Sequence, residues 1–357
     1  MLLFQFYTIL LGLLSKFSAF IGCDLSINIG TTNTLIYERE RGIVLEEPSL
    51  IAVQQDRYSQ QENIIAVGLE AKKMVGRTPE KTRVARPIRD GVISDFTLAE
   101  AMLKHFMVKS IGARYLRLPR ILITVPCGAN QVERRAIRDI ASSVGARSVY
   151  LIDEPIAAAV GTNLPIDRAT GSMVLDIGGG TADVAVMSMN GIVYANSIRI
   201  GSEKFDKAII NYIKNKRNII IGDVTAEDIK LTIGDMSGVK LSHFEGKGVS
   251  IRDGIPESFK ISNDEVKEAI IPEINKIVQA IKDALEQTPP ELAADISNNG
   301  LVLTGGGSQL RGLAQYVASA TNLTVILAQH PTTCVVRGGG LVLEMSEINR
   351  GNFVNLS

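Results

Sequence analysis

The alternation of hydrophobic and polar positions is clearest between Val174 and Met187. An apolar run reaches Asp176, a glycine turn follows, and an alternating run extends from Asp183. The turn consists of Gly178, Gly179 and Gly180. This pattern predicts two antiparallel strands joined by the turn, whose successive N–H groups would form an anion-binding nest. A single turn of this kind is equally well explained as an ordinary hairpin connection.

A stretch about 150 residues earlier has the same organisation, with a strand pattern from Ile27, a Gly/Thr turn and a second strand pattern to Tyr37. The positions at this turn are Asn28, Gly30, Thr31, Thr32 and Asn33. A third glycine turn follows the apolar strand that starts at Leu301, and it consists of Gly305, Gly306 and Gly307. Two matching phosphate-type hairpins suggest a duplicated domain with a nucleotide between the halves, which is a more specific signal than one turn.

Strands and helices alternate in both halves of the chain, and this alternation predicts α/β layers. Thr97 and Glu100 have the spacing of a capping box, so a helix is expected to start there. A long helical pattern begins at about Asp264. Pro272 is expected to interrupt that helix, because proline lacks the N–H that a helix interior uses.

The first 20 residues are the most apolar stretch of the chain. A helix from Met1 to Leu14 would be only about 21 Å long, whereas the hydrocarbon core of a bilayer is about 30 Å thick. A full membrane span is therefore not expected, and the lack of a positive charge before the apolar run argues against a secretory signal. The favoured interpretation is a helix lying in the membrane surface. A helix docked on the protein and an unstructured tail are the alternatives.

The bulk composition argues against several other classes of protein. The chain has 357 residues, 45% of them hydrophobic, which suffices for two domains or one large duplicated unit. Lys and Arg together number 38, as do Asp and Glu, so no basic excess indicates nucleic acid binding. Three scattered cysteines and three scattered histidines form neither a disulfide framework nor a metal motif. The sequence has no Walker A or G-x-G-x-x-G motif, which argues against a P-loop NTPase and a Rossmann oxidoreductase.

Taken together, the motifs resemble the MreB family of bacterial actins, within the actin/sugar-kinase/heat-shock-chaperone ATPase superfamily. The resemblance extends from about Phe20 to about Glu347. The matching segments are Gly30–Thr34, Gly42–Ser49, Gly76–Pro79, Asp90–Phe96, Val132–Ala136, Glu154–Ala159, Asp176–Asp183, Thr288–Asp295 and Leu303–Gly307. The resemblance implies an actin-like ATPase fold, in which two duplicated α/β halves each carry a smaller outer subdomain and enclose a nucleotide cleft.

The resemblance also implies a division of the chain. Residues 1–22 would be an apolar membrane-associating segment, and residues 23–163 would form the first half, with its outer subdomain at about 48–94. Residues 164–325 would form the second half, with its outer subdomain at about 201–264. Residues 326–357 would supply a C-terminal helix that returns to the first half, followed by a tail.

For the site, the resemblance implies ATP and Mg²⁺. The turns at Gly30–Thr32 and Gly178–Gly180 would hold the phosphates from two sides, while Asp176 would hold Mg²⁺, mostly through water. Glu154 would orient the attacking water with help from Thr181. An acid at the start of a helix is also favoured by the helix dipole alone, so a purely structural role for Glu154 is the alternative.

The resemblance places the rest of the nucleotide against the second half. Glu227 and Lys230 lie three residues apart on a predicted helix and would reach the ribose or the base. A solvated ion pair is the alternative explanation for these two residues. The third glycine turn, at Gly305–Gly307, would let the adenine lie directly against backbone.

One position departs from the family pattern. The family's first hairpin normally opens Asp-Leu-Gly-Thr, and an ungapped match places Asn28 where that aspartate belongs. A gapped match would use Asp24 instead, although Asp24 lies roughly 13 Å away along a strand. The ungapped match is favoured because it keeps the strand alternation into Gly30. With Asn28 at this position, only weak ATP hydrolysis is expected.

The resemblance implies a cytoskeletal filament that binds ATP, lies in the cytoplasm at the inner surface of the plasma membrane and helps to set cell shape. The expected partners are copies of the chain itself, the membrane, and other actin-like paralogues or cell-shape proteins; no nucleic acid is expected. Three alternatives are a nucleotide-binding scaffold without turnover, a sugar-kinase-like enzyme and a chaperone-like ATPase of the same superfamily.

Overall fold

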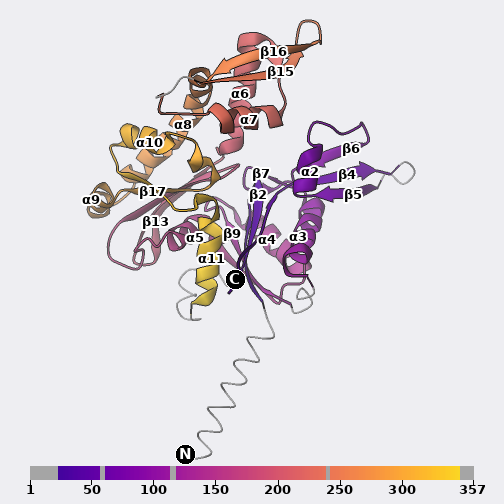
Figure 1. Cartoon of the computed structure of the whole chain (residues 1–357). Helices are drawn as coiled ribbons and strands as arrows, with labels where there is room; N and C mark the ends of the chain where they lie inside the picture. The colour runs from indigo at the N-terminus through magenta and orange to yellow at the C-terminus, as the bar shows by residue number, and fades with distance from the viewer. Residues whose placement is uncertain (1–22, 57–60, 113–117, 239–241, 346–357) are drawn as a thin grey trace, which may run out of the picture.

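The computed structural model describes residues 23–56, 61–112, 118–238 and 242–345. Two five-stranded sheets form the body of this part of the chain, and helices pack on both of them (Figure 1). Smaller groups of strands extend outward from each sheet (Figure 1). The α/β layers predicted from the alternation of patterns are therefore present.

The first sheet is built around the first predicted hairpin. β1 and β2 pair antiparallel, and β9 and β10 continue the sheet in parallel on the other side of β1. Across the sheet the strands are β10 (Ser148–Asp153), β9 (Arg120–Val125), β1 (Asp24–Ile29), β2 (Asn33–Glu38) and β3 (Gly42–Pro48). The helices of this half are α3 (Phe96–Ile111), α4 (Gln131–Ser143) and α5 (Glu154–Gly161). Apolar side chains of the strands, α3 and α4 form one buried core.

The second sheet repeats the first, strand for strand. β11 and β12 form the central hairpin in antiparallel pairing, and β17 and β18 continue the sheet in parallel beside β11. In order the strands are β13 (Gly191–Ile198), β12 (Ala182–Ser188), β11 (Ser172–Ile177), β17 (Leu301–Thr304) and β18 (Val325–Leu327). Its helices are α6 (Ser202–Arg217), α8 (Asn263–Glu286), α9 (Pro290–Asn299) and α10 (Leu313–Thr321). The repeated strand order confirms the duplication inferred from the two hairpins.

Short sheets form the outer parts of both halves. In the first half these elements are β5 (Glu62–Val67), β4 (Ile51–Gln55), β6 (Thr82–Ala85), α2 (Leu69–Met74) and the ribbon of β7 (Ile88–Arg89) and β8 (Val92–Ile93). In the second half they are β14 (Ile219–Ile220), β15 (His243–Ser250), β16 (Pro256–Ser262) and α7 (Asp223–Ile233). α2 and α7 approach each other across the space between the halves, where Lys72 meets Glu227.

Two helices join the halves. α11 (Cys334–Glu344), preceded by the 3-10 turn η3 (Pro331–Thr333), packs on α5 and reaches β1 of the first sheet (Figure 1). The contact is very close, because a Cβ on Gly338 would lie 1.8 Å from the Ala157 carbonyl oxygen. Apolar residues of α5 and α11 form one core with residues of both sheets, such as Leu122 and Val174. The two sheets are thus held at a fixed distance on the side away from the outer subdomains.

Two local predictions are wrong. Pro272 does not interrupt the long helix, since α8 is continuous from Asn263 to Glu286. Pro272 is exposed, so water can solvate the carbonyl that loses its bond, while Ile270 and Ile274 anchor the flanking turns in the core. The helix expected to start at Thr97 is capped instead by Asp95, whose carboxylate accepts a hydrogen bond from the Leu98 N–H at 3.0 Å.

No helix among the described residues is both long enough and apolar enough to cross a bilayer. The segment of residues 1–22, on which the membrane prediction rests, lies outside the described residues. Its association with a membrane stays a prediction from the sequence.

Candidate functional site

The two duplicated hairpins end in turns of the same geometry. In the first turn the Gly30 N–H donates to the Asn33 carbonyl at 3.1 Å, and in the second the Gly178 N–H donates to the Thr181 carbonyl at 2.9 Å. Asn28 lies near the end of β1, two residues before Gly30, and Asp176 lies near the end of β11, two residues before Gly178. Asn28 and Asp176 therefore occupy equivalent positions in the two hairpins. The structural repeat therefore extends to individual positions of the site.

The turns lie against each other across the space between the halves. A Cβ on Gly179 would lie 2.0 Å from Thr32 Oγ1, and a Cβ on Gly180 would lie 2.4 Å from Thr31 Oγ1. Any side chain at these two glycines would push the halves apart, so the close approach explains why glycine is needed there. The two turns are therefore neighbours in the fold, and that they face one nucleotide stays a prediction.

Three buried carboxyl groups lie at the base of the turns. Glu154 begins α5, Asp176 is the next-to-last residue of β11, and Asp183 faces Asp176 on β12. Burial raises the pKa of Asp176 to about 7, with a smaller contribution from the charge of Asp183. Burial also raises the pKa of Glu154 and Asp183, and the negative charges of Asp183 and Asp176 raise that of Glu154 further. An acid cluster of this kind disfavours its own ionisation unless a cation is near.

The oxygens of this cluster fit a hydrated cation. Asp176 Oδ1 and Asp183 Oδ2 are buried and accept no hydrogen bond from any described residue, although Asp183 Oδ1 accepts one from the Cys127 N–H at 3.1 Å. Within the described parts of the chain, no three His, Cys, Asp or Glu side chains converge closely enough to ligate a metal directly. Mg²⁺ usually retains several of its waters, so Asp176 and its neighbours would hold it mainly through water.

Asn28 rather than Asp24 lies beside the first turn. Asn28 pairs with Leu35 at the turn end of the hairpin, and its Oδ1 is buried without a described partner. Asp24 lies at the opposite end of β1, where it accepts hydrogen bonds from Arg120. The carboxylate of Asp24 is therefore engaged elsewhere, and the ungapped match describes the fold.

The third glycine turn contacts the second. A Cβ on Gly305 would lie 2.3 Å from the Ile177 carbonyl oxygen and 2.4 Å from Asp176 Oδ1. Gly307, in the 3-10 turn η2 (Gly306–Gln309), also lies against Ile177, whereas Gly306 is exposed. The three glycine turns thus meet at the ends of β1, β11 and β17.

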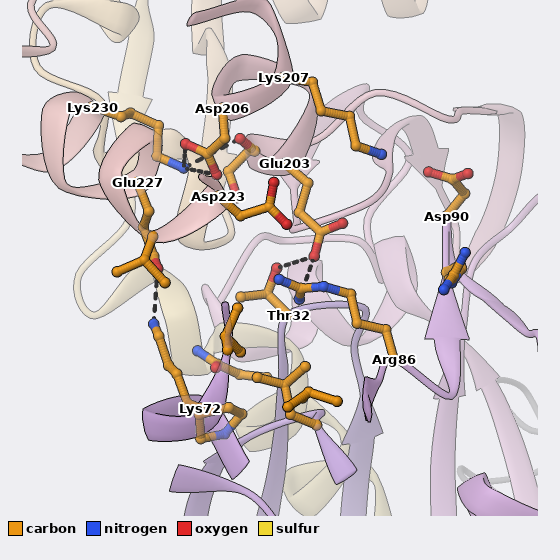
Figure 2. A pocket seen from close by; sticks show the side chains of 18 residues that line it. Thr32, Lys72, Arg86, Asp90, Glu203, Asp206, Lys207, Asp223, Glu227 and Lys230 are labelled. Atoms are coloured by element: carbon orange, nitrogen blue, oxygen red, sulfur yellow. Dashed lines mark hydrogen bonds and ion pairs between the residues drawn. The ribbon is translucent and has the colours of Figure 1, made fainter. Parts of the chain in front are cut away.

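A cavity of about 390 Å³ opens beside the first turn, whose residues Thr32 and Asn33 line it, between the two outer subdomains (Figure 2). Glu227 and Lys230 both line it, and their role at a ribose or base stays a prediction. They do not pair with each other: Glu227 accepts a hydrogen bond from Lys72 of α2 at 3.0 Å, and Lys230 binds Asp206 of α6 at 2.8 Å (Figure 2). The solvated pair between Glu227 and Lys230 is absent.

A second link crosses the cavity at Glu203, a residue that the sequence analysis did not single out. Glu203 Oε1 accepts hydrogen bonds from Arg86 at 2.9 Å and from Thr32 Oγ1 at 3.4 Å (Figure 2). Arg86 and Thr32 belong to the first half, whereas Glu203 begins α6 of the second. The helix start at Gly201-Ser202 was visible in the sequence, but no local pattern connects it to Arg86.

The chain is similar to known proteins over nearly all of its length. Residues 22–350 match the family model described as MreB/Mbl protein. The chain is 49% identical over 342 residues to the cell shape-determining protein MreB of Escherichia coli (strain K12), covering 95% of this chain and 99% of that protein. It is 43% identical over 322 residues to the cell shape-determining protein Mbl of Bacillus subtilis (strain 168), covering 90% and 96%.

A solved structure gives the same result at the level of the fold. MreB5 of Spiroplasma citri bound to AMPPNP superposes with a TM-score of 0.86 at 33% identity, covering 93% of this chain and 98% of that one. This similarity confirms the actin-like α/β fold that was expected from the sequence.

Proposed function

The chain belongs to the MreB/Mbl family, and from this membership we propose that it is an ATP-binding protein that assembles into filaments and helps to set cell shape. The observation that supports this function best is the contact between the two duplicated turns, Gly30–Asn33 and Gly178–Thr181, beside the cavity that Thr32 and Asn33 line. The relatives from E. coli and B. subtilis are named for cell-shape determination, and the MreB5 structure holds the ATP analogue AMPPNP.

In this proposal each turn binds phosphate through backbone N–H groups. Within the described residues, the N–H groups of Thr31, Thr32, Gly179 and Gly180 donate to no backbone carbonyl, and successive N–H groups left free in this way form an anion nest. Asp176, Asp183 and Glu154 lie at the base of the turns and would hold Mg²⁺ through its waters. The bound cation would supply the positive charge that neutralises the phosphate oxygens.

The burial and position of Glu154 support a role in ATP hydrolysis. Glu154 is buried at the start of α5 beside Asp176 and Asp183, and burial and the negative charges of these neighbours raise its pKa well above the ordinary value. A nearby positive charge would lower that pKa and leave a carboxylate able to orient water. Thr181, which is buried at the second turn, would assist. Asn28 occupies the position that is equivalent to Asp176, where the family pattern has an aspartate. The site therefore has one carboxylate fewer than the family pattern, and we propose that ATP hydrolysis is slow.

The proposal places the filaments at the inner surface of the plasma membrane. The apolar sequence of residues 1–22 supports this placement, because interfacial binding scales with the apolar area that a helix buries. Other actin-like paralogues or cell-shape proteins are the further partners we propose. Head-to-tail contacts that do not close into a ring give open filaments.

ATP-dependent sedimentation tests this function. The full chain should pellet in an ultracentrifuge with ATP and Mg²⁺, and it should stay in the supernatant without nucleotide. Asp176→Asn should lose the response to ATP, whereas the exposed control Asp167→Asn should behave as the unmodified chain. A chain that stays monomeric with ATP and Mg²⁺, at high concentration and on lipid, would instead favour a sugar-kinase-like or chaperone-like ATPase.

A further inference from the structure

The carbonyl groups of the second turn are held by the start of a helix. The Gly178 carbonyl accepts a hydrogen bond from the Ser202 N–H at 3.0 Å, and the Gly179 carbonyl accepts one from the Glu203 N–H at 2.9 Å. Both donors are backbone groups at the first turn of α6. These two hydrogen bonds fix the orientation of the peptide groups that carry the Gly179 and Gly180 N–H groups.

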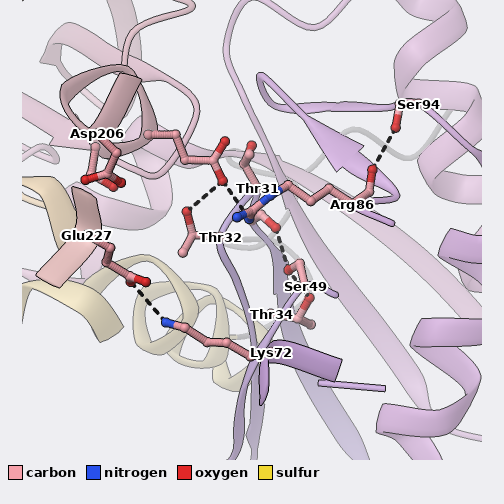
Figure 3. Close-up of polar contacts among 12 residues, drawn as sticks. Thr31, Thr32, Thr34, Ser49, Lys72, Arg86, Ser94, Asp206 and Glu227 are labelled. Atoms are coloured by element: carbon pink, nitrogen blue, oxygen red, sulfur yellow. Dashed lines mark hydrogen bonds and ion pairs between the residues drawn. The ribbon is translucent and has the colours of Figure 1, made fainter. Parts of the chain in front are cut away.

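In the first turn a single residue, Ser49, holds two carbonyl groups, those of Gly30 and Thr32. The Thr32 carbonyl accepts from the Ser49 N–H at 2.8 Å, and the Gly30 carbonyl accepts from the Ser49 hydroxyl at 2.6 Å (Figure 3). Ser49 lies between β3 and β4 and is completely buried. One of the two supports of the first turn is thus a side chain, which a substitution can remove without altering the backbone.

The hydroxyl of Ser49 is itself fixed in direction. Its oxygen lies 2.9 Å from Thr34 Oγ1, which is also buried. Because Ser49 has one hydroxyl proton and directs it to the Gly30 carbonyl, the Thr34 hydroxyl is the donor to Ser49. The chain of hydrogen bonds runs from Thr34 to Ser49, both labelled in Figure 3, and from Ser49 to the Gly30 carbonyl.

We infer that Ser49 is a positioning residue for phosphate binding: its hydroxyl holds the Gly30 carbonyl back so that the Thr31 N–H, which belongs to the same peptide group, faces the phosphates. This inference rests on the proposed nucleotide site. Ser49 itself does not touch the nucleotide. Without the hydroxyl, the Gly30 carbonyl loses its partner and the peptide between Gly30 and Thr31 is free to rotate, so the nest is no longer preformed.

The third turn supplies a matched control. The Ser308 hydroxyl donates to the Gly305 carbonyl, also at 2.6 Å, and Ser308 is 2% exposed. Ser49→Ala and Ser308→Ala therefore remove the same bond, of the same length, at equally buried positions. They differ in the part of the nucleotide that the affected turn would face, which is phosphate for Gly30 and base for Gly305.

Calorimetric titration of the full chain with ATP and with adenosine tests the inference. Ser49→Ala should weaken ATP binding about tenfold, equivalent to about 1.4 kcal/mol, and should change adenosine binding less than twofold. Ser308→Ala should weaken the binding of ATP and the binding of adenosine by a similar factor. Ser49→Cys keeps a hydrogen-bond donor at this position, although a weaker one, so its loss of ATP affinity should be intermediate. If Ser49→Ala does not fold, Ser49→Cys is used for the test instead.

The outcomes separate the possible failures. If Ser49→Ala and Ser49→Cys keep the ratio of ATP to adenosine affinity of the unmodified chain, or lose both affinities equally, Ser49 is a structural residue and the inference is overturned. If the unmodified chain does not bind ATP, the proposed function fails instead, whatever the variants do.

Discussion

Replacing Asp176 by asparagine tests whether the buried acids create a need for a cation. In the metal-free protein the pKa of Asp176 rises from the ordinary 3.8 to about 7, chiefly because the carboxyl is buried. Between these two values the unfolded chain has lost the proton while the folded chain keeps it. The folded state then binds more protons, so its stability falls as the pH rises through this window.

The size of the effect follows from the two pKa values. Ionisation of Asp176 lowers the free energy of unfolding by an amount on the order of 4 kcal/mol once the pH is above 7. A small part of this loss is already present at pH 4.5. Asparagine has the same shape and no charge. When the pH rises from 4.5 to 8 in EDTA without nucleotide, the free energy of unfolding of Asp176→Asn should therefore increase by about 3 kcal/mol relative to that of the unmodified chain.

Urea unfolding followed by circular dichroism measures this difference. Asp167→Asn, at an exposed position, is the control and should follow the unmodified chain at every pH. Addition of ATP and Mg²⁺ at pH 8 should stabilise the unmodified chain but not Asp176→Asn, because the carboxylate that binds the cation has been removed. Parallel stability profiles for Asp176→Asn and the unmodified chain between pH 4.5 and 8 would show that burial of Asp176 carries no such penalty.

Two other predictions follow from the site and from the sequence. Asn28→Asp should release phosphate from ATP about tenfold faster than the unmodified chain, which requires the activation barrier to fall by only about 1.4 kcal/mol. Glu154→Ala should bind ATP but release no phosphate. Equal rates of phosphate release by the unmodified chain and both variants would exclude both residues from turnover. Deletion of residues 1–20 should leave folding and nucleotide binding intact and reduce co-sedimentation with liposomes, and equal co-sedimentation of both chains would contradict the membrane assignment.

The hairpins and the duplication were predictable because their signals are local. The alternation around Asp176 and the glycines after it specify a strand, a turn and a strand whatever surrounds them. The same holds for Asn28, whose place at the end of β1 follows from uninterrupted alternation into Gly30. The family resemblance then assigned roles to these positions, including the acid at Glu154.

Local signals failed where two of them competed or where packing outweighed them. Asp95 and Thr97 are both good helix caps, and the capping bond to the Leu98 N–H is made by Asp95. Pro272 has a strong tendency to break a helix, but the buried side chains of Ile270 and Ile274 hold α8 together on either side of it. A few kcal/mol of burial exceeds the loss of one hydrogen bond that water can replace.

Only the tertiary structure decided which partner each polar group of the site has. Glu227 and Lys230 are neighbours in sequence, yet their partners are Lys72 and Asp206. Ser49 holds a turn 19 residues away, and Glu203 meets Arg86 across 117 residues. Hydrogen bonds and ion pairs of this kind depend on how two halves dock, and docking is set by the summed burial of α5, α11 and both sheets. The sequence by itself therefore determined the strands, the turns and the acids, whereas the folded chain determined which of them act together.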